Sequence, residues 1–302
     1  MLYLIFPSVN LRCHLAGYIL YKINISFIMS SVNTIIQKQN SGILHPSGLP
    51  DWLTAHGLST VTTEECAYLL GIPINEVPQR LVRLRAKGQL VSVARGLWVA
   101  VPAEYREMGA PEPIRYIHNL MGFYESDYCV GWLSAASLHG AHHHAPQVFQ
   151  VAVSKTLRKR TVGRSELQFF SRSYVPLITK SKISISNGSA LVCSPGATML
   201  MVAADPLNCG GIDNAATIIY ELAENHSDFT RKIMTDARLF PKAAVRRLGW
   251  ILDHVAEVDV SELLDFCSGS LEPALLSPGG ARSGSIDKKW NVIENRRIEV
   301  DI

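Results

Sequence analysis

Hydrophobic and polar positions between Val61 and Val101 change from a helical period to a strand-like one. Thr62 and Glu65, three residues apart, form a capping box, because their side chains can satisfy backbone N–H groups that a first helical turn leaves free. Gly71 ends this helix in a conformation that favours glycine. After a short turn, the side chain of Asn75 is expected to cap a second helix.

The second predicted helix, from Asn75 to Lys87, has an apolar face and a basic face. Val77, Leu81 and Leu84 recur at the spacing of one helical face, which favours packing against the first helix. The opposite side is a stripe of long hydrogen-bond donors without an acid, made of Gln79, Arg80, Arg83 and Lys87. Such a stripe suits the major groove of DNA, although a solvated basic face is the ordinary alternative.

A β-hairpin is predicted after Gly88. The segments LVSV and LWVAV are rich in β-forming residues and flank the turn Ala94-Arg95-Gly96, in which Arg95 would lie at the tip. A further helix over Leu49–Gly57 precedes the capped one. Each part is a weak signal alone, but their order predicts a winged helix-turn-helix over residues 47–102.

A larger domain of mixed helices and strands is expected over residues 114–302, after a proline-containing connection over 103–113. The fold class is therefore α+β, with an N-terminal winged helix-turn-helix followed by a larger mixed α/β C-terminal domain. Strands are expected at 148–154, 167–170, 183–186, 190–193 and 290–293, with a hairpin turn at Asn187-Gly188. Helices are expected at 114–124, 132–139, 196–204, 214–224, 229–239, 242–255 and 261–267.

Cysteine usage favours a cytoplasmic protein, and the predicted DNA-binding unit would associate it with the nucleoid. The 302 residues suffice for two domains, and the formal net charge of +3 is mild. Six cysteines without a C-x-x-C pair indicate reduced thiols rather than disulfides or a zinc site. Residues 1–28 are apolar, but Pro7, Arg12 and Lys22 interrupt them, so no membrane span of about 20 residues is predicted.

The first residues have the pattern of an extension. Met29, followed by two serines, resembles an alternative start of translation, and residues 1–28 are then untranslated or a disordered extension. Residues 1–46 together would form an arm ahead of the DNA-binding unit.

The most basic part of the chain lies between residues 155 and 182, where eight bases face one acid, Glu166. The bases are Lys155, Arg158, Lys159, Arg160, Arg164, Arg172, Lys180 and Lys182. A solvated hairpin loop is the plain interpretation. In a chain with a helix-turn-helix, contact with DNA phosphates is the better hypothesis.

Candidate catalytic patterns are incomplete. The histidines His139, His142, His143 and His144 lack a neighbouring carboxylate or cysteine, so a loop is favoured over a metal site. A metal-dependent nuclease needs two or more carboxylates on neighbouring strands, whereas residues 128–204 contain Glu166 alone. Gly210-Gly211 lacks the lysine of a P-loop, and neither Ser134 nor Ser137 lies in a G-x-S-x-G elbow. No catalytic residue, metal or cofactor is predicted.

Several segments in order resemble the AbiEi family of type IV toxin–antitoxin systems over residues 49–295. They are GQLVSVARGLWVAV, YCVGWLSAASLHGAHHHAPQVFQVAVSK, VCSPGATMLMVAADP, NCGG, RRLGWILD and KKWNVIEN. The resemblance implies an N-terminal domain that represses its own operon through inverted repeats and a C-terminal domain for antitoxicity. It implies as partner an AbiEii-like toxin of nucleotidyltransferase type, commonly without a stable complex, and it assigns no active-site residue.

The expected function is that of a DNA-binding autorepressor and antitoxin. Gln79, Arg80 and Arg83 would lie nearest base edges, with Lys87 nearer phosphate. Arg95 would meet the backbone or minor groove, while the phosphate contacts would extend through Lys155, Arg158, Lys159 and Arg160. The protein would be a monomer or two protomers assembled on DNA. The rivals are an enzyme, either a divergent nuclease or a kinase-like modifier of the toxin, and a module that neutralises the toxin by contact.

Overall fold

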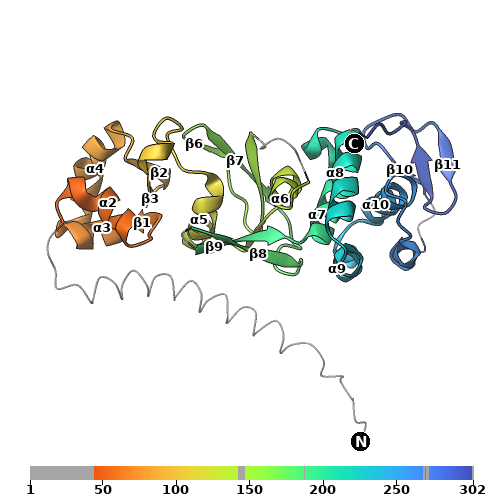
Figure 1. Cartoon of the computed structure of the whole chain (residues 1–302), viewed down its shortest axis with the longest axis horizontal. Helices are drawn as coiled ribbons and strands as arrows, with labels where there is room; N and C mark the ends of the chain where they lie inside the picture. Colours follow the sequence, from red (N-terminus) through yellow and green to blue (C-terminus); the bar gives the residue numbers. More distant parts are fainter. Residues whose placement is uncertain (1–43, 142–146, 187, 268, 270–271, 301–302) are drawn as a thin grey trace, which may run out of the picture.

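The structure, a computed structural model, describes residues 44–141, 147–186, 188–267, 269 and 272–300. These residues form an elongated molecule with an N-terminal helical unit at one end, a sheet in the middle, and a helical layer with a small second sheet at the other end (Figure 1). The expected start at Met29, the histidines His142, His143 and His144, and Asn187 lie outside the described residues.

The N-terminal unit has the predicted three helices and hairpin, together with one strand that the sequence pattern did not predict. Its elements are α2 (Leu49–Ala55), β1 (Thr60–Thr62), α3 (Thr63–Leu70), α4 (Val77–Ala86), β2 (Leu90–Ala94) and β3 (Leu97–Ala100). The added strand β1 pairs antiparallel with β3, so the hairpin becomes a three-stranded sheet of order β1-β3-β2. The turn closes at Gly96, which has a φ of +95°.

The predicted capping box is confirmed, and the predicted cap of α4 is wrong. The backbone N–H of Thr62 donates to Glu65 Oε2 at 2.8 Å, and the N–H of Glu65 donates to Thr62 Oγ1 at 3.1 Å. Asn75 instead lies in the middle of a 3-10 turn, Ile74–Glu76, and α4 begins after it without a side-chain cap. The intervening turn holds Asn75 away from the free N–H groups of α4 that a cap would satisfy.

The central sheet is mixed, with the order β6-β7-β5-β4-β9-β8. Its strands are β4 (Tyr128–Val130), β5 (Val148–Val153), β6 (Arg160–Val162), β7 (Ser165–Ser171), β8 (Lys180–Ile185) and β9 (Gly188–Cys193). The pairs β5–β7 and β4–β9 are parallel, and the other neighbours are antiparallel. The expected ribbon is confirmed as β8–β9, whereas the three-residue strands β4 and β6 were not predicted.

The two faces of the central sheet belong to different cores, because successive side chains of a strand point to opposite faces. Tyr128 and Val130 of β4 pack in a core with helix α5 (Ile117–Phe123), while Cys129 between them packs in the core of the helical layer. Val151, Val153 and Ala152 of β5 divide in the same way. The sheet therefore joins the N-terminal half of the molecule to its C-terminal half.

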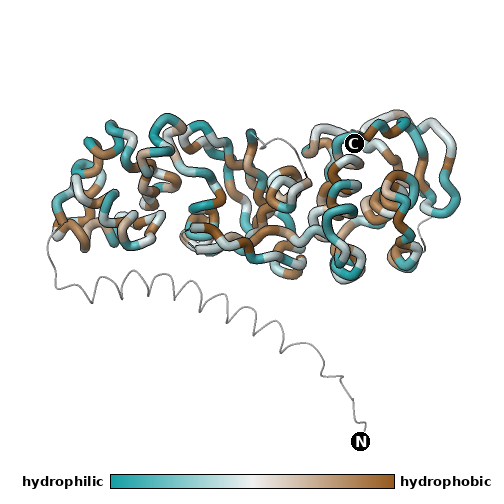
Figure 2. Tube along the Cα trace, viewed as in Figure 1, coloured by the Kyte–Doolittle hydropathy of each residue, from teal (hydrophilic) through white to brown (hydrophobic). Residues whose placement is uncertain are grey.

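The helical layer agrees with the predicted helices. It contains α6 (Trp132–Leu138), α7 (Pro195–Ala204), α8 (Ile212–Asn225), α9 (Phe229–Asp236), α10 (Lys242–His254) and α11 (Leu264–Cys267). Helix α7, of which nine residues are buried, runs through this layer as a largely apolar segment (Figure 2). No helix in the parts that the structure describes is long and apolar enough to cross a membrane.

A small C-terminal sheet, β10-β12-β11, is attached to α10 through a buried arginine. Its strands are β10 (Ala274–Leu275), β11 (Ser285–Asp287) and β12 (Val292–Glu294). Arg247 of α10 is 5% exposed and donates to the carbonyl oxygens of Leu275, Leu276 and Ala203. Burial lowers the pKa of Arg247 to about 10. The guanidinium thus ties the strand to the helix through backbone acceptors.

The hairpin β2–β3 is shared between the N-terminal unit and the central sheet. Val93, Leu97 and Val99 are buried in the core that also contains α5 and one face of the sheet. The expected connection over 103–113 is packed as well, since the N–H of Arg164 donates to the carbonyl of Met108 at 2.9 Å. The N-terminal unit and the rest of the chain therefore share buried apolar surface.

Gly249 of α10 lies against the ring of Trp290, and a Cβ at this position would overlap the ring. We expect Gly249→Ala to lower the free energy of unfolding by about 1–3 kcal/mol through overpacking. The measurement is thermal or denaturant unfolding of the full chain. Gly48→Ala is the matched control, since its nearest atom would be Leu44 Cδ2 at 3.9 Å. Equal stability of the two variants would contradict the packing.

Candidate nucleic-acid interface

Helix α4 presents the predicted stripe to solvent. Gln79, Arg80, Arg83 and Lys87 are all exposed. On the opposite face Val77, Leu81 and Leu84 are buried in the core of the N-terminal unit, together with α2 and α3. The apolar face therefore fixes the rotation of α4, and this rotation turns the long donors outward.

The stripe is not free of intramolecular contacts. Arg80 forms an exposed ion pair with Glu76, one turn earlier, at 3.2 Å. An exposed pair of this kind contributes little to stability and can exchange for a phosphate or a base edge. Arg85, which is not part of the stripe, lies over the ring of Trp98 at 5.7 Å.

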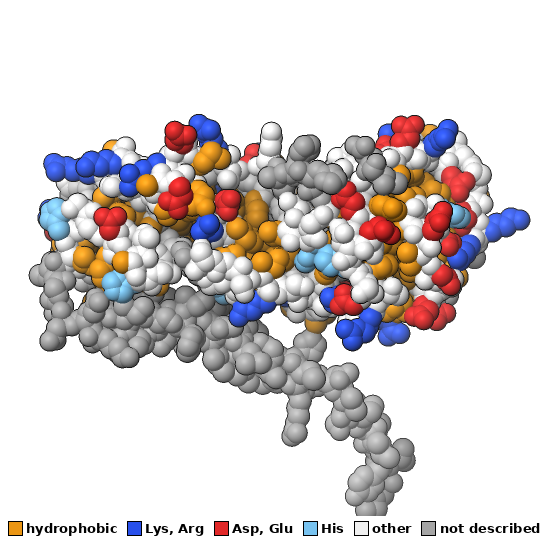
Figure 3. All heavy atoms as spheres, in the orientation of Figure 1, with side chains coloured by type: hydrophobic (Ala, Val, Ile, Leu, Met, Phe, Trp, Pro, Cys, Tyr) orange, Lys and Arg blue, Asp and Glu red, His pale blue; other side chains and the backbone are white. Residues whose placement is uncertain are grey.

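A groove of about 530 Å³ lies beside the stripe, between α4 and β2. Val82 and Arg85 line it from the helix, Val91 and Ser92 from the strand, and Gly109 from the segment that follows. Basic side chains gather on the upper edge of the N-terminal unit, whereas acidic and basic side chains are mixed at the opposite end of the molecule (Figure 3). The gathered basic side chains favour approach of a polyanion to this edge of the N-terminal unit.

The tip of the hairpin carries Arg95, which is exposed. Its neighbour Gly96 is held from two sides: its carbonyl accepts from the N–H of Thr63 at 2.9 Å, and a Cβ there would lie 3.6 Å from the Phe123 ring of α5. The tip is thus fixed against α3 and α5, while the side chain of Arg95 remains accessible.

The predicted basic segment divides into outward and inward residues. Arg158 and Lys159 are exposed, and Lys159 pairs with Glu166 at 3.3 Å. Lys155 is exposed too, but its Nζ donates to the carbonyl of Tyr124 at 2.8 Å. Of these cations, Arg158 and Lys159 lie best for an external phosphate.

Arg160, which was predicted to contact DNA, joins the hairpin to the central sheet. Its guanidinium donates to the carbonyl of Val93 in β2 and lies over the rings of Tyr124 and Phe169, at 5.2 and 5.8 Å. Nearby, Asn119 of α5 donates to Thr60 Oγ1 of β1 at 2.7 Å. These contacts use Arg160 inside the molecule, a role without a local sequence signal.

Two histidines are half-buried and have specific partners. His118 Nδ1 lies 3.0 Å from the hydroxyl of Tyr128, and the same hydroxyl accepts from the N–H of Leu191 at 3.0 Å. Burial, with a smaller contribution from the charge of Lys182, lowers the pKa of His118. His139, from the predicted histidine loop, lies with Nε2 2.7 Å from the carbonyl of Cys193, and burial lowers its pKa also.

One group of side chains in the described ranges could hold a metal ion, and it is not the predicted histidine run. It consists of His254, Asp287 and Glu294. The sequence pattern did not indicate it, because the three residues come from α10, β11 and β12 and have no metal-ligand spacing.

Comparison with known proteins identifies the middle of the chain. Residues 129–254 match the family described as the AbiEi antitoxin C-terminal domain, which confirms the predicted resemblance to AbiEi antitoxins and supports an antitoxin role in a type IV toxin–antitoxin system. The crystal structure of the RV2827C protein from Mycobacterium tuberculosis is similar with a TM-score of 0.56 and 15% sequence identity, covering 84% of this chain and 94% of that one. At this identity the likeness concerns the fold alone. Curated proteins gave no match.

Arg160→Gln removes the hydrogen bond to Val93 and the contacts with two rings. We expect a loss of about 1–2 kcal/mol in the free energy of unfolding, read from denaturant titration. Arg158→Gln, two residues away and exposed, is the matched control and should change stability by less than about 0.5 kcal/mol. Equal effects of the two substitutions would contradict the inward role of Arg160.

Stability should fall as the pH drops below about 6.5, because the unfolded chain then binds protons that the half-buried His118 and His139 resist. Their lowered folded-state pKa values set the sign: stability is present above the ordinary histidine pKa and is lost below it. We expect His118→Gln to reduce the slope of stability against pH, by up to about 1.4 kcal/mol per unit. Unfolding titrations between pH 7.5 and 5.5 measure it, and an unchanged slope would refute the assignment.

Proposed function

We propose that this chain, which carries an AbiEi antitoxin C-terminal domain over residues 129–254, is an antitoxin that also represses its own operon by binding DNA. The observation that carries the DNA-binding part is the exposed, acid-free stripe on α4, in a unit whose elements follow the order helix, strand, helix, helix, hairpin. This order is that of a winged helix-turn-helix, with α4 as recognition helix and β2–β3 as wing. Residues 47–102 form this unit, 103–113 connect it, and 114–302 form the antitoxin domain.

Helix α4 reads the operator from the major groove. Gln79, Arg80 and Arg83 approach base edges, and Lys87 at the end of the helix approaches phosphate. A guanidinium presents two parallel donors, which match the two acceptors on the major-groove edge of guanine. Arg83 is exposed in the middle of the stripe, between Arg80 and Lys87, and is the main candidate for this contact.

Contacts with phosphate extend the footprint. Arg158 and Lys159 are exposed just before β6. Lys159 would leave its ion pair with Glu166 and bind a DNA phosphate instead. Lys155 joins them by giving up the carbonyl of Tyr124, and Arg95 reaches the backbone or minor groove from the tip of the wing. Arg160 is left out of this surface because it holds the wing to the sheet.

Two protomers occupy an inverted repeat upstream of the operon, whose symmetry mirrors that of the bound pair. The protein acts in the cytoplasm at the nucleoid. Its partner is a toxin of the nucleotidyltransferase type, counteracted by the C-terminal domain with or without a lasting complex. No cofactor or catalytic residue enters this proposal, and the strands of the central sheet carry Glu166 as their single acid, where a nuclease metal needs two or more carboxylates.

Arg83→Ala should weaken binding to the upstream operator by about 1–3 kcal/mol and relax base preference, measured by mobility-shift titration against operators changed one base pair at a time. Lys159→Gln is the matched comparison. It should weaken all duplexes alike and reduce the slope of log affinity against log salt by roughly one. Operator binding that is unchanged in Arg83→Ala would overturn the assignment of α4.

The substitution Arg83→Ala should abolish repression of the operon and leave protection against the toxin intact. In cells that express the neighbouring toxin from an independent promoter, Arg83→Ala should still rescue growth as the wild-type chain does, while a reporter under the native promoter loses repression. Loss of rescue at equal protein level would contradict a toxin-directed function that lies outside α4.

A further inference from the structure

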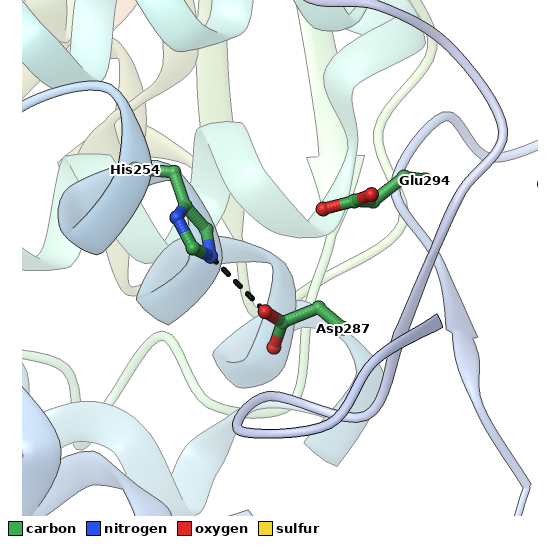
Figure 4. Close-up of side chains that lie close together, drawn as sticks. All are labelled: His254, Asp287 and Glu294. Atoms are coloured by element: carbon green, nitrogen blue, oxygen red, sulfur yellow. Dashed lines mark hydrogen bonds and ion pairs between the residues drawn. The ribbon is translucent and has the colours of Figure 1, made fainter. Parts of the chain in front are cut away.

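Three potential metal ligands converge at the C-terminal end of the molecule, far along the chain from the proposed DNA surface (Figure 4). His254 is the last residue of α10, Asp287 ends β11, and Glu294 ends β12. One nitrogen of the histidine and one oxygen of each carboxylate lie within 4.8 Å of one another. His254 is exposed and the two acids are half-buried, so an ion can enter from solvent without moving the core.

The spacing of these atoms is close to that of a tetrahedral site. His254 Nε2 and Asp287 Oδ2 are 3.1 Å apart. Two ligands about 2.0–2.1 Å from a zinc ion at the tetrahedral angle lie roughly 3.3 Å apart. A Zn²⁺ ion could therefore replace the hydrogen bond between these two side chains after a small movement, and a modest approach of Glu294 would supply the third ligand.

The carboxylates are held in position by other hydrogen bonds. Asp287 Oδ1 accepts from the N–H of Trp290 at 2.6 Å. Glu294 Oε2 accepts from the hydroxyl of Ser285 at 2.6 Å, and its Oε1 accepts from the indole of Trp250 at 3.1 Å. Donors of this kind commonly orient carboxylates that ligate metals, and they reduce the entropy lost when the ion binds.

We propose that His254, Asp287 and Glu294 form a binding site for a divalent transition metal of the zinc class, with water as the fourth ligand. One imidazole and two carboxylates in a small site suit Zn²⁺, whereas Mg²⁺ and Ca²⁺ require six or more oxygen ligands. Bound metal pins the strands β11 and β12 to the end of α10. The site is structural, and it is separate from operator binding.

The test is calorimetric titration of ZnCl₂ into the full chain, prepared without an affinity tag and stripped with EDTA. The chain and its site variants are titrated in the background His142→Ala, His143→Ala and His144→Ala, which removes the histidine run of the sequence as a competing ligand, and the native chain is titrated beside them. We expect one Zn²⁺ per chain, no comparable binding of Mg²⁺, and a thermal midpoint raised by about 3 °C or more at saturation.

His254→Gln and Asp287→Asn should each weaken Zn²⁺ binding at least about tenfold and abolish the thermal shift. Asp287→Asn keeps an oxygen that can accept from Trp290, so it tests the site even if His254→Gln fails to fold. Zinc bound equally well by both variants, or bound by the native chain and lost in the triple histidine background, would overturn the proposal.

Discussion

The packing of the β2–β3 hairpin on the central sheet is the interaction on which the rest of the structure depends. Val93 and Leu97 point into the same core as α5, and Arg160 closes the edge of this contact by donating to the carbonyl of Val93. Buried apolar area of this kind is the main source of stability in a small interface. The N-terminal unit is therefore not a freely tethered module, and the position of α4 is fixed relative to the AbiEi segment over 129–254.

In the proposed function, this constraint determines which residues can contact DNA. The strands β2 and β3 are largely buried against a second core, so Arg95 at the tip is the part of the hairpin left for DNA, and base reading is assigned to α4. The net charge of the C-terminal part of the chain is also unfavourable for contact with DNA. Between residues 205 and 302 sixteen acids outnumber eleven lysines and arginines, which would repel phosphate from the C-terminal end. His254, Asp287 and Glu294 converge at this same C-terminal end.

Local signals predicted most elements, and long-range contacts account for what was missed. The box of Thr62 and Glu65 and the apolar period of α4 are contained within one or two helical turns, so the sequence was sufficient for them. The strands β1, β4 and β6 have three residues each, too few to establish an alternation, and they exist because of their partners. Asn75 is a residue type that commonly caps helices, but it lies in the 3-10 turn before α4 and not at the N-terminus of that helix. The sequence around Arg160 did not distinguish it from an exposed base, because its hydrogen-bond acceptor, the carbonyl of Val93, is 67 residues away in the chain.

Hydrogen exchange of the full chain, with and without a duplex that contains its upstream inverted repeat, tests the central claim most directly. If the stripe of α4 reads the operator, bound DNA should slow amide exchange over residues 77–87 and change β2 and β3 little, since those strands are already paired and buried. A bound duplex that leaves exchange over residues 77–87 unchanged would contradict it.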